Sequence, residues 1–141
     1  MQRIILDTNV LVSALISNAA PAKILHNVVL KQRVTLLLSN DVFEEYVDVL
    51  SRDKFTGFRD FKSRTDIVLT KLKEISTFYQ PSEKVDVLTD QSDNKFLELA
   101  ASSTADYLIT GNTNDFTLIE FESTKIITPR NYWDNFWSKD N

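Results

Sequence analysis

The chain has 141 residues, 43% of them hydrophobic and 26% charged, which is typical of one globular domain, and we expect a single domain spanning residues 1–141. The absence of cysteine excludes disulfides, thiolate catalysis and cysteine-ligated zinc, and two glycines are too few for a glycine-rich phosphate-binding loop. The formal net charge of −4 argues against a large non-specific nucleic-acid surface, although it permits a local basic patch beside an acidic pocket.

The apolar runs are far shorter than the roughly 20 residues that span a bilayer, and the N-terminus lacks a signal peptide's apolar core and cleavage site. We therefore expect a cytoplasmic protein with no membrane association.

Short apolar runs alternate with longer amphipathic stretches. In chain order we predict a strand at Arg3–Leu6, helices at Val10–Ile16 and Pro21–Leu30, a strand at Val34–Leu38, helices from Ser39 or Asn40 to Leu50 and at Phe61–Phe78, a strand at Thr77–Tyr79 or Val85–Leu88, a helix at Ser92–Ser102, strands at Tyr107–Ile109 and Lys125–Ile127, and a helix from Pro129. The alternation predicts an α/β fold in which helices cover both faces of a parallel sheet of four to five strands.

Polar residues follow the predicted strands directly: Asp7, Ser39, Thr110 and Thr128. The carboxyl ends of parallel strands meet at one edge of the sheet, where ligands bind, so we expect these side chains to converge. Asp7 suits two roles at this point, because aspartate is favoured both as the N-cap of a following helix and as a ligand.

Other acidic residues fall on predicted helices. In "NDVFEEYVDVL", Glu44 and Glu45 flank the apolar face on opposite sides, and Glu45 lies slightly closer to it. The alternative is that both glutamates are solvated surface charges. In "SDNKFLELAA", Asp93 projects near the middle of the apolar face, so its carboxylate needs a helix cap, a cation or a metal. Asp90 is its neighbour one turn earlier.

After the strand ending at Ile109, "TGNTNDF" supplies Gly111 for a turn, Asn112 as a neutral oxygen ligand and Asp115 as a further carboxylate. A polar loop explains this segment as well as a site does. Together, Asp7, Glu45, Asp93 and Asp115 can meet at the edge of the sheet only if a cation neutralises them. Oxygen ligands favour Mg²⁺ or Mn²⁺ over zinc, and we interpret the only histidine, His26, as a packing residue.

Carboxylate-held Mg²⁺ or Mn²⁺ suits phosphodiester hydrolysis by a metal-activated water. A further group of side chains is expected to orient the carboxylates or the water: Thr8, Asn9, Ser39, Asp90 and Thr110.

Residues 52–64, within "SRDKFTGFRDFKSR", combine cations with interleaved phenylalanines, as single-strand binding requires. The candidate RNA-binding cations are Arg52, Lys54, Arg59, Lys62 and Arg64. The alternative is a solvated loop whose phenylalanines Phe55, Phe58 and Phe61 pack into the core.

Four segments, "ILDTNVLVSAL", "LLSNDVFEEYVDVL", "DQSDNKFLELAASSTADYLITGN" and "IITPRNYW", resemble the successive motifs of PIN domains, in the branch of toxin components related to VapC-type ribonucleases. The resemblance runs from Ile4 to about Phe136. It implies a three-layer α/β/α fold and Mg²⁺- or Mn²⁺-dependent RNA cleavage. It also implies frequent homodimerisation and an antitoxin partner.

Carried over by position, the resemblance implies that Asp7, Glu45 and Asp93 are the first three acidic metal ligands. Many PIN domains have an aspartate where this chain has Asn112, so the fourth ligand is Asn112, Asp115 or a water held by either residue.

Two alternatives to an endoribonuclease stay open from the sequence. Asn112 in place of an acid favours a non-catalytic RNA- or protein-binding module with the same fold. A phosphatase that uses a strand-end aspartate as nucleophile ranks last, because Asn9 stands where that class has a second aspartate.

Overall fold

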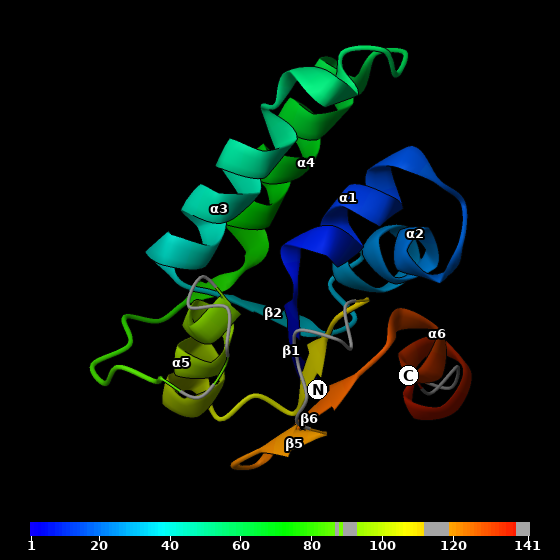
Figure 1. The fold of residues 1–141 in the computed structure, drawn as a ribbon. Coiled ribbons are helices and arrows are strands. Elements are labelled where there is room, and N and C mark those ends of the chain that lie inside the picture. The colour runs from blue at the N-terminus through cyan, green and yellow to red at the C-terminus, as the bar shows by residue number, and fades with distance from the viewer. Residues whose placement is uncertain (87, 89–92, 112–118, 138–141) are drawn as a thin grey trace.

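Figure 1 shows the computed structural model, which describes residues 1–86, 88, 93–111 and 119–137. Its strands form a six-stranded sheet in the order β3-β2-β1-β4-β6-β5, with every neighbouring pair parallel except β5 and β6. The strands are β1 Arg3–Leu6, β2 Thr35–Leu38, β3 Thr77–Phe78, β4 Tyr107–Ile109, β5 Glu120–Phe121 and β6 Thr124–Ile127. The predicted α/β fold with a mainly parallel sheet flanked by helices is therefore confirmed.

The sheet has one strand more than the four to five predicted. The additional strand, β5, has two residues and pairs antiparallel with β6 across a turn at Glu122, whose φ is 53°. Neither glycine nor proline marks this turn in the sequence. Such a short strand carries too little hydrophobic periodicity to be recognised from the sequence.

The helices are α1 Thr8–Ile16, α2 Ala20–Ile24, α3 Asn40–Leu50, α4 Phe61–Ile75, α5 Asn94–Ser103 and α6 Pro129–Asn131, with π-helical turns at Leu25–Val29 and Tyr132–Phe136 and a 3₁₀ turn at Asp53–Phe55. Helix α4 ends three residues before the predicted boundary. It ends there because Thr77 and Phe78 pair with β2 instead of continuing the helix. The segment predicted as one helix from Pro21 to Leu30 divides into α2 and the π-helical turn that follows it.

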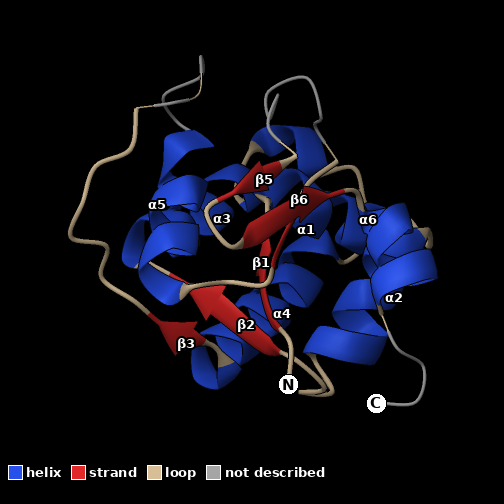
Figure 2. Ribbon diagram, turned by 90° about the horizontal axis from the view of Figure 1, so that it is seen from below, coloured by secondary structure: helices blue, strands red, loops and turns tan. Residues whose placement is uncertain are grey.

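Buried aliphatic side chains form the core around the central strands: Ile4, Ile5 and Leu6 of β1 and Leu36, Leu37 and Leu38 of β2 are all at most 2% exposed. Figure 2 shows the strands running through the middle of the molecule with helices around them. Burial on both faces explains why these strands read as continuous apolar runs. Within the described ranges, no helix is long and apolar enough to cross a lipid bilayer.

Helices α3 and α4 form a long hairpin that projects away from the sheet (Figure 1). Helix α1 packs against both α3 and α4. The connection between α3 and α4 lies at the end of the hairpin away from the sheet, whereas the beginning of α3 lies close to the sheet (Figure 1).

The strand order reverses beside β1. The chain passes from β1 through α1 and α2 to β2, on one side, and later returns through α5 to β4 on the other side. In a parallel sheet, ligands bind in the crevice at such a switch point. The register pairs Leu6 with Ile109, so the next residues, Asp7 and Thr110, lie side by side at the carboxyl ends of the two strands.

Candidate metal centre

Asp7 occupies the N-cap position of α1, with φ −64° and ψ 150°, yet its side chain makes no capping hydrogen bond. Instead, its carboxylate Oδ2 accepts a hydrogen bond of 2.7 Å from the Thr110 hydroxyl. Both side chains are buried, at 5% and 0% exposure. The backbone N–H of Asp7 donates to the Ile109 carbonyl at 2.9 Å. The carboxylate therefore lies at the switch point between β1 and β4 and is not used for capping.

Glu45 reaches the same region from α3. It is half-buried, whereas its neighbour Glu44 is exposed. The Thr8 hydroxyl donates to Glu45 Oε2, and the Lys95 ammonium donates to Glu45 Oε1 at 3.0 Å. Side chains of α1 and α5 thus both donate to one carboxylate of α3.

Tyr46, the next residue on α3, is fully buried, and its hydroxyl donates to the Leu6 carbonyl at 2.5 Å. Burial raises the pKa of Tyr46 well above its ordinary value, and the carboxylates of Asp7 and Glu45 add to the shift. The phenol therefore remains a hydrogen-bond donor, and it fixes α3 against the end of β1.

Asp93 immediately precedes α5 and occupies its N-cap position without a side-chain capping hydrogen bond. It is half-buried, so its side chain is less buried than we expected from its predicted place on the apolar face of the helix. The next residue, Asn94, is buried, and its Oδ1 accepts from the Leu88 backbone N–H at 2.9 Å. Asn94 thereby ties the beginning of α5 to the chain before it.

Lys95 has no role in the sequence prediction, although it contacts a predicted ligand directly. The available signal was its position in the first turn of α5, where a positive side chain interacts unfavourably with the positive end of the helix dipole. A lysine in this position indicates a partner outside its own helix. That partner is Glu45.

One cavity of about 410 Å³ brings the acidic residues together, since Asp7, Glu45 and Asp93 all line it. Arg52 and Lys54, from the connection after α3, form part of its wall. The remaining lining residues are Thr8, Asn9, Val12, Ser13, Val49 and Phe55. Carboxylates from three distant segments thus face one space that also holds cationic side chains.

The other predicted orienting residues divide into three groups. Thr8 and Thr110 contact the carboxylates directly. Asn9 accepts from the Gly111 backbone N–H at 3.2 Å and so links the cavity to the end of β4. Ser39 instead caps α3, with its hydroxyl accepting from the Val42 N–H at 3.2 Å. The remaining predicted site residues, Asp90, Asn112 and Asp115, lie outside the described residues.

The chemistry of these donors fits Mg²⁺ or Mn²⁺. The carboxylates of Asp7, Glu45 and Asp93 are hard oxygen ligands, and the neighbouring groups are hydroxyls and an amide. Among the described residues, no three histidine, cysteine, aspartate or glutamate side chains are already gathered closely enough to form a ligand cluster. The described part thus supplies suitable donors around one cavity, without a closed set of ligands.

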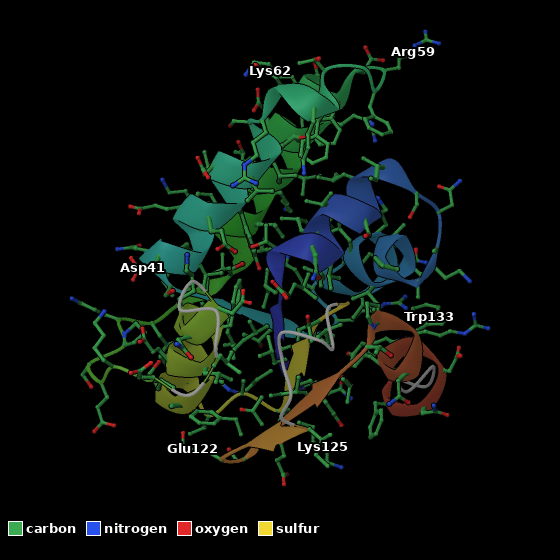
Figure 3. The ribbon with its side chains drawn as sticks, in the orientation of Figure 1. Asp41, Arg59, Lys62, Glu122, Lys125 and Trp133 are labelled. Carbon is green, nitrogen blue, oxygen red and sulfur yellow. The ribbon has the colours of Figure 1, made fainter. Side chains whose placement is uncertain are left out.

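The predicted RNA-binding cations occupy different environments. Arg52 and Lys54 line the acidic cavity. Arg59 and Lys62 lie at the far end of the α3–α4 hairpin and point into solvent (Figure 3), where they pair with Asp60 and Asp66. The Arg64 guanidinium donates to the Leu15 carbonyl at 2.9 Å and therefore ties α4 to α1.

The three phenylalanines of the same segment divide similarly. Phe55 and Phe61 are 5% and 4% exposed, and their rings stack with centroids 4.9 Å apart. Phe58 is 42% exposed. Two of the rings therefore stabilise the hairpin, and Phe58 alone of the three presents a large exposed surface.

Residues 3–114 match the family profile described as the PIN domain. This chain belongs to the PIN domain family. The matched residues include the three acidic residues that line the cavity and Thr110, which bonds to Asp7. PIN domains are generally nucleases, which agrees with an oxygen-rich acidic pocket at the switch point of the sheet.

Two known proteins resemble this PIN domain over most of its length. An uncharacterized protein of Methanocaldococcus jannaschii, MJ1680, is 27% identical over 143 residues, which cover 95% of this chain and 91% of that protein. A chain in the crystal structure of VapBC2 from Rickettsia felis, bound to a DNA fragment from its promoter, superposes with a TM-score of 0.59 at 18% identity. That match covers 90% of this chain and 98% of the other, and it supports the fold.

Proposed function

We propose that this PIN domain is a Mg²⁺- or Mn²⁺-dependent endoribonuclease that hydrolyses RNA phosphodiester bonds. The observation that carries the proposal is the single cavity lined by Asp7, Glu45 and Asp93, three carboxylates that come from different segments and meet at the switch point. Either Asn112 or Asp115 is proposed as a fourth ligand.

A divalent ion held there would polarise a phosphoryl oxygen and lower the pKa of a bound water, which supplies the nucleophile without a protein side chain. The chain's own residues would hold the donors in place. The Thr110 hydroxyl fixes one oxygen of Asp7, and Thr8 and Lys95 fix the two oxygens of Glu45. Such contacts orient carboxylates and the water beside them.

Arg52 and Lys54 are proposed to contact RNA phosphates beside the scissile bond, since they line the same cavity as the carboxylates. Arg59 and Lys62 extend the proposed RNA contact toward the tip of the hairpin. Arg64 remains a candidate through the outer surface of its guanidinium, although its main hydrogen bond is internal.

We further propose that the protein is the toxin of a toxin–antitoxin pair, acts in the cytoplasm and forms a homodimer. The structural likeness to a chain of the Rickettsia felis VapBC2 complex supports an antitoxin partner. A small neighbouring reading frame with a DNA-binding motif is expected. Co-expression of that frame should suppress both RNA cleavage and growth inhibition.

The sharpest test measures cleavage of a labelled single-stranded RNA with Mg²⁺ or Mn²⁺ and with a chelator. We expect Asp7→Asn, Glu45→Gln and Asp93→Asn to lose activity by several orders of magnitude. Glu44→Gln is the matched control, because Glu44 is exposed one residue away from Glu45 on the same helix. It should cleave at the wild-type rate.

Three results would contradict the proposal: activity that survives Asp7→Asn and Asp93→Asn, activity that survives the chelator, or equal losses in Glu44→Gln and Glu45→Gln. RNA binding without any cleavage in the presence of either metal would favour the non-catalytic binding module instead.

The phosphate contacts have their own test, in which RNA binding is measured over a range of salt concentrations. Loss of one phosphate contact should lower the magnitude of the slope of log K against log salt by about 1. Lys54→Glu and Lys62→Glu make the same charge change inside and outside the cavity. Slopes equal to the wild-type slope in both variants would remove this segment from the binding surface.

A further inference from the structure

The ion pair between Lys95 and Glu45 differs from the other ion pairs of the described residues. It is 3.0 Å long, and its side chains are only 25% and 18% exposed. The others all join side chains that are more than half exposed: Asp48–Arg52, Arg59–Asp60, Lys62–Asp66 and Arg130–Asp134. A half-buried ammonium in a proposed metal centre therefore requires an explanation of its own.

Glu45 has both carboxylate oxygens engaged within the described structure. Oε1 accepts from Lys95 and Oε2 accepts from the Thr8 hydroxyl. A metal pair bridged by this carboxylate would need one oxygen for each ion, about 3.5–4 Å apart. The ammonium already occupies one of those two positions, and its three N–H donors leave two beyond the bond to Glu45 for a phosphate oxygen.

The cationic side chains of the site lead to the same conclusion. Glu45 is already paired with Lys95, and Arg52 and Lys54 also line the cavity that Asp7, Glu45 and Asp93 share. A second divalent ion would therefore lie beside resident positive charges as well as beside the first ion, and like charges at such distances repel.

We propose that the Lys95 ammonium takes the place of a second metal ion, so that this centre binds one divalent ion per chain and uses the lysine as its other cation. The inference rests on the proposed metal-dependent nuclease function. It assigns Lys95 to the site, and it distinguishes a one-metal centre with a resident ammonium from a two-metal centre.

The test measures Mn²⁺ binding to the full chain by isothermal titration calorimetry and electron paramagnetic resonance. We expect one Mn²⁺ per chain for the wild type, with the spectrum of an isolated ion. Lys95→Met should bind two Mn²⁺ and show an exchange-coupled pair, because the second cation position becomes open. Lys95→Arg keeps the charge and should stay at one ion.

Lys73→Met is the matched control. It makes the same substitution in an exposed lysine of α4 that does not line the cavity. It should bind one Mn²⁺ as the wild type does. Circular dichroism of each variant, with and without Mn²⁺, verifies that the altered stoichiometry belongs to folded protein, and Lys95→Ala provides a second variant if Lys95→Met does not fold.

Several outcomes would overturn the inference. Two ions in the wild type, or one ion with unchanged affinity in Lys95→Met, would each show that Lys95 does not replace a metal. Tighter binding of a single ion in Lys95→Met would mean that the metal displaces the lysine. If the wild type binds two ions and cleaves RNA, only this inference fails. If it binds none and does not cleave, the proposed function fails with it.

Discussion

The bond between Thr110 and Asp7 provides a quantitative test of the site, because the chain contains a matching bond elsewhere. The Thr110 hydroxyl donates to a carboxylate oxygen at 2.7 Å, and the Thr124 hydroxyl donates to the Ala105 carbonyl, also at 2.7 Å. Both threonines are buried, at 0% and 1% exposure. Replacing either one with valine removes the hydroxyl and preserves the shape of the side chain.

The two substitutions should differ in cost because the acceptors differ in charge. A hydrogen bond between neutral groups contributes about 1 kcal/mol to the free energy of unfolding, whereas one to a charged group contributes about 1.5–3 kcal/mol. Thr110→Val should therefore destabilise the protein by about 0.5–2 kcal/mol more than Thr124→Val. Urea denaturation followed by circular dichroism gives both values from the midpoint and slope.

The same two valine variants should distinguish an effect on stability from an effect on activity. We expect Thr110→Val to lower RNA cleavage by about 10–100-fold, the usual effect of removing a group that orients a metal ligand. Thr124→Val should cleave at the wild-type rate, and Thr110→Ser should recover most of the lost activity because it keeps the hydroxyl. Equal destabilisation by both valine substitutions, together with equal activity, would refute the view that Thr110 positions Asp7.

Three further predictions concern the scaffold. Burial raises the pKa of Tyr132, whose hydroxyl donates to Gln2. The resulting stabilisation is complete below the usual tyrosine pKa of about 10 and is lost as the pH rises toward the pKa of the folded state. From about pH 9 to about pH 11, the urea midpoint should therefore fall more for the wild type than for Tyr132→Phe. Arg64→Met loses the bond to the Leu15 carbonyl, so its free energy of unfolding, measured by urea denaturation, should fall by about 1 kcal/mol. An unchanged salt slope of RNA binding in this variant would remove Arg64 from the proposed RNA contact, and an unchanged free energy of unfolding would contradict the role given to its hydrogen bond. Gly111→Ala should change the free energy of unfolding by less than about 0.5 kcal/mol, because φ there is not positive and the new Cβ would lie 3.6 Å from Asn9 Oδ1; a larger loss in urea denaturation would contradict this.

The sequence predicts the main elements well where burial is strong. The apolar runs at Arg3–Leu6 and Tyr107–Ile109 are strands with the predicted bounds, because strands buried on both faces must be apolar throughout. Helix α3 begins where Ser39 caps it, as the capping preference of serine indicates. The end of α4 could not be placed, because pairing with β2, a tertiary contact, decides where that helix stops.

Only part of the candidate site could be predicted from the sequence. Polar residues at the strand ends predict that Asp7 and Thr110 converge, and the register of β1 with β4 places them side by side. The sequence could not predict that the cations of residues 52–64 lie in different places, because only the geometry of the hairpin puts Lys54 in the cavity and Lys62 at the tip. The pairing of Lys95 with Glu45 could not be predicted either, because the two residues lie 50 positions apart and no local pattern joins them.

The hydrogen bonds of the site determine which substitutions test chemistry without disturbing the fold. In Asp7→Asn, the amide oxygen can still accept from the Thr110 hydroxyl, so this hydrogen bond is kept when the charge is lost. In Glu45→Gln, one oxygen becomes an NH₂ donor. Lys95 has no lone pair with which to accept it, but the Thr8 hydroxyl can rotate and accept. The glutamine should therefore turn its oxygen to Lys95 and its NH₂ to Thr8, and Glu45→Gln with Thr8→Val should be less stable than the two single changes predict, because the NH₂ then loses that acceptor.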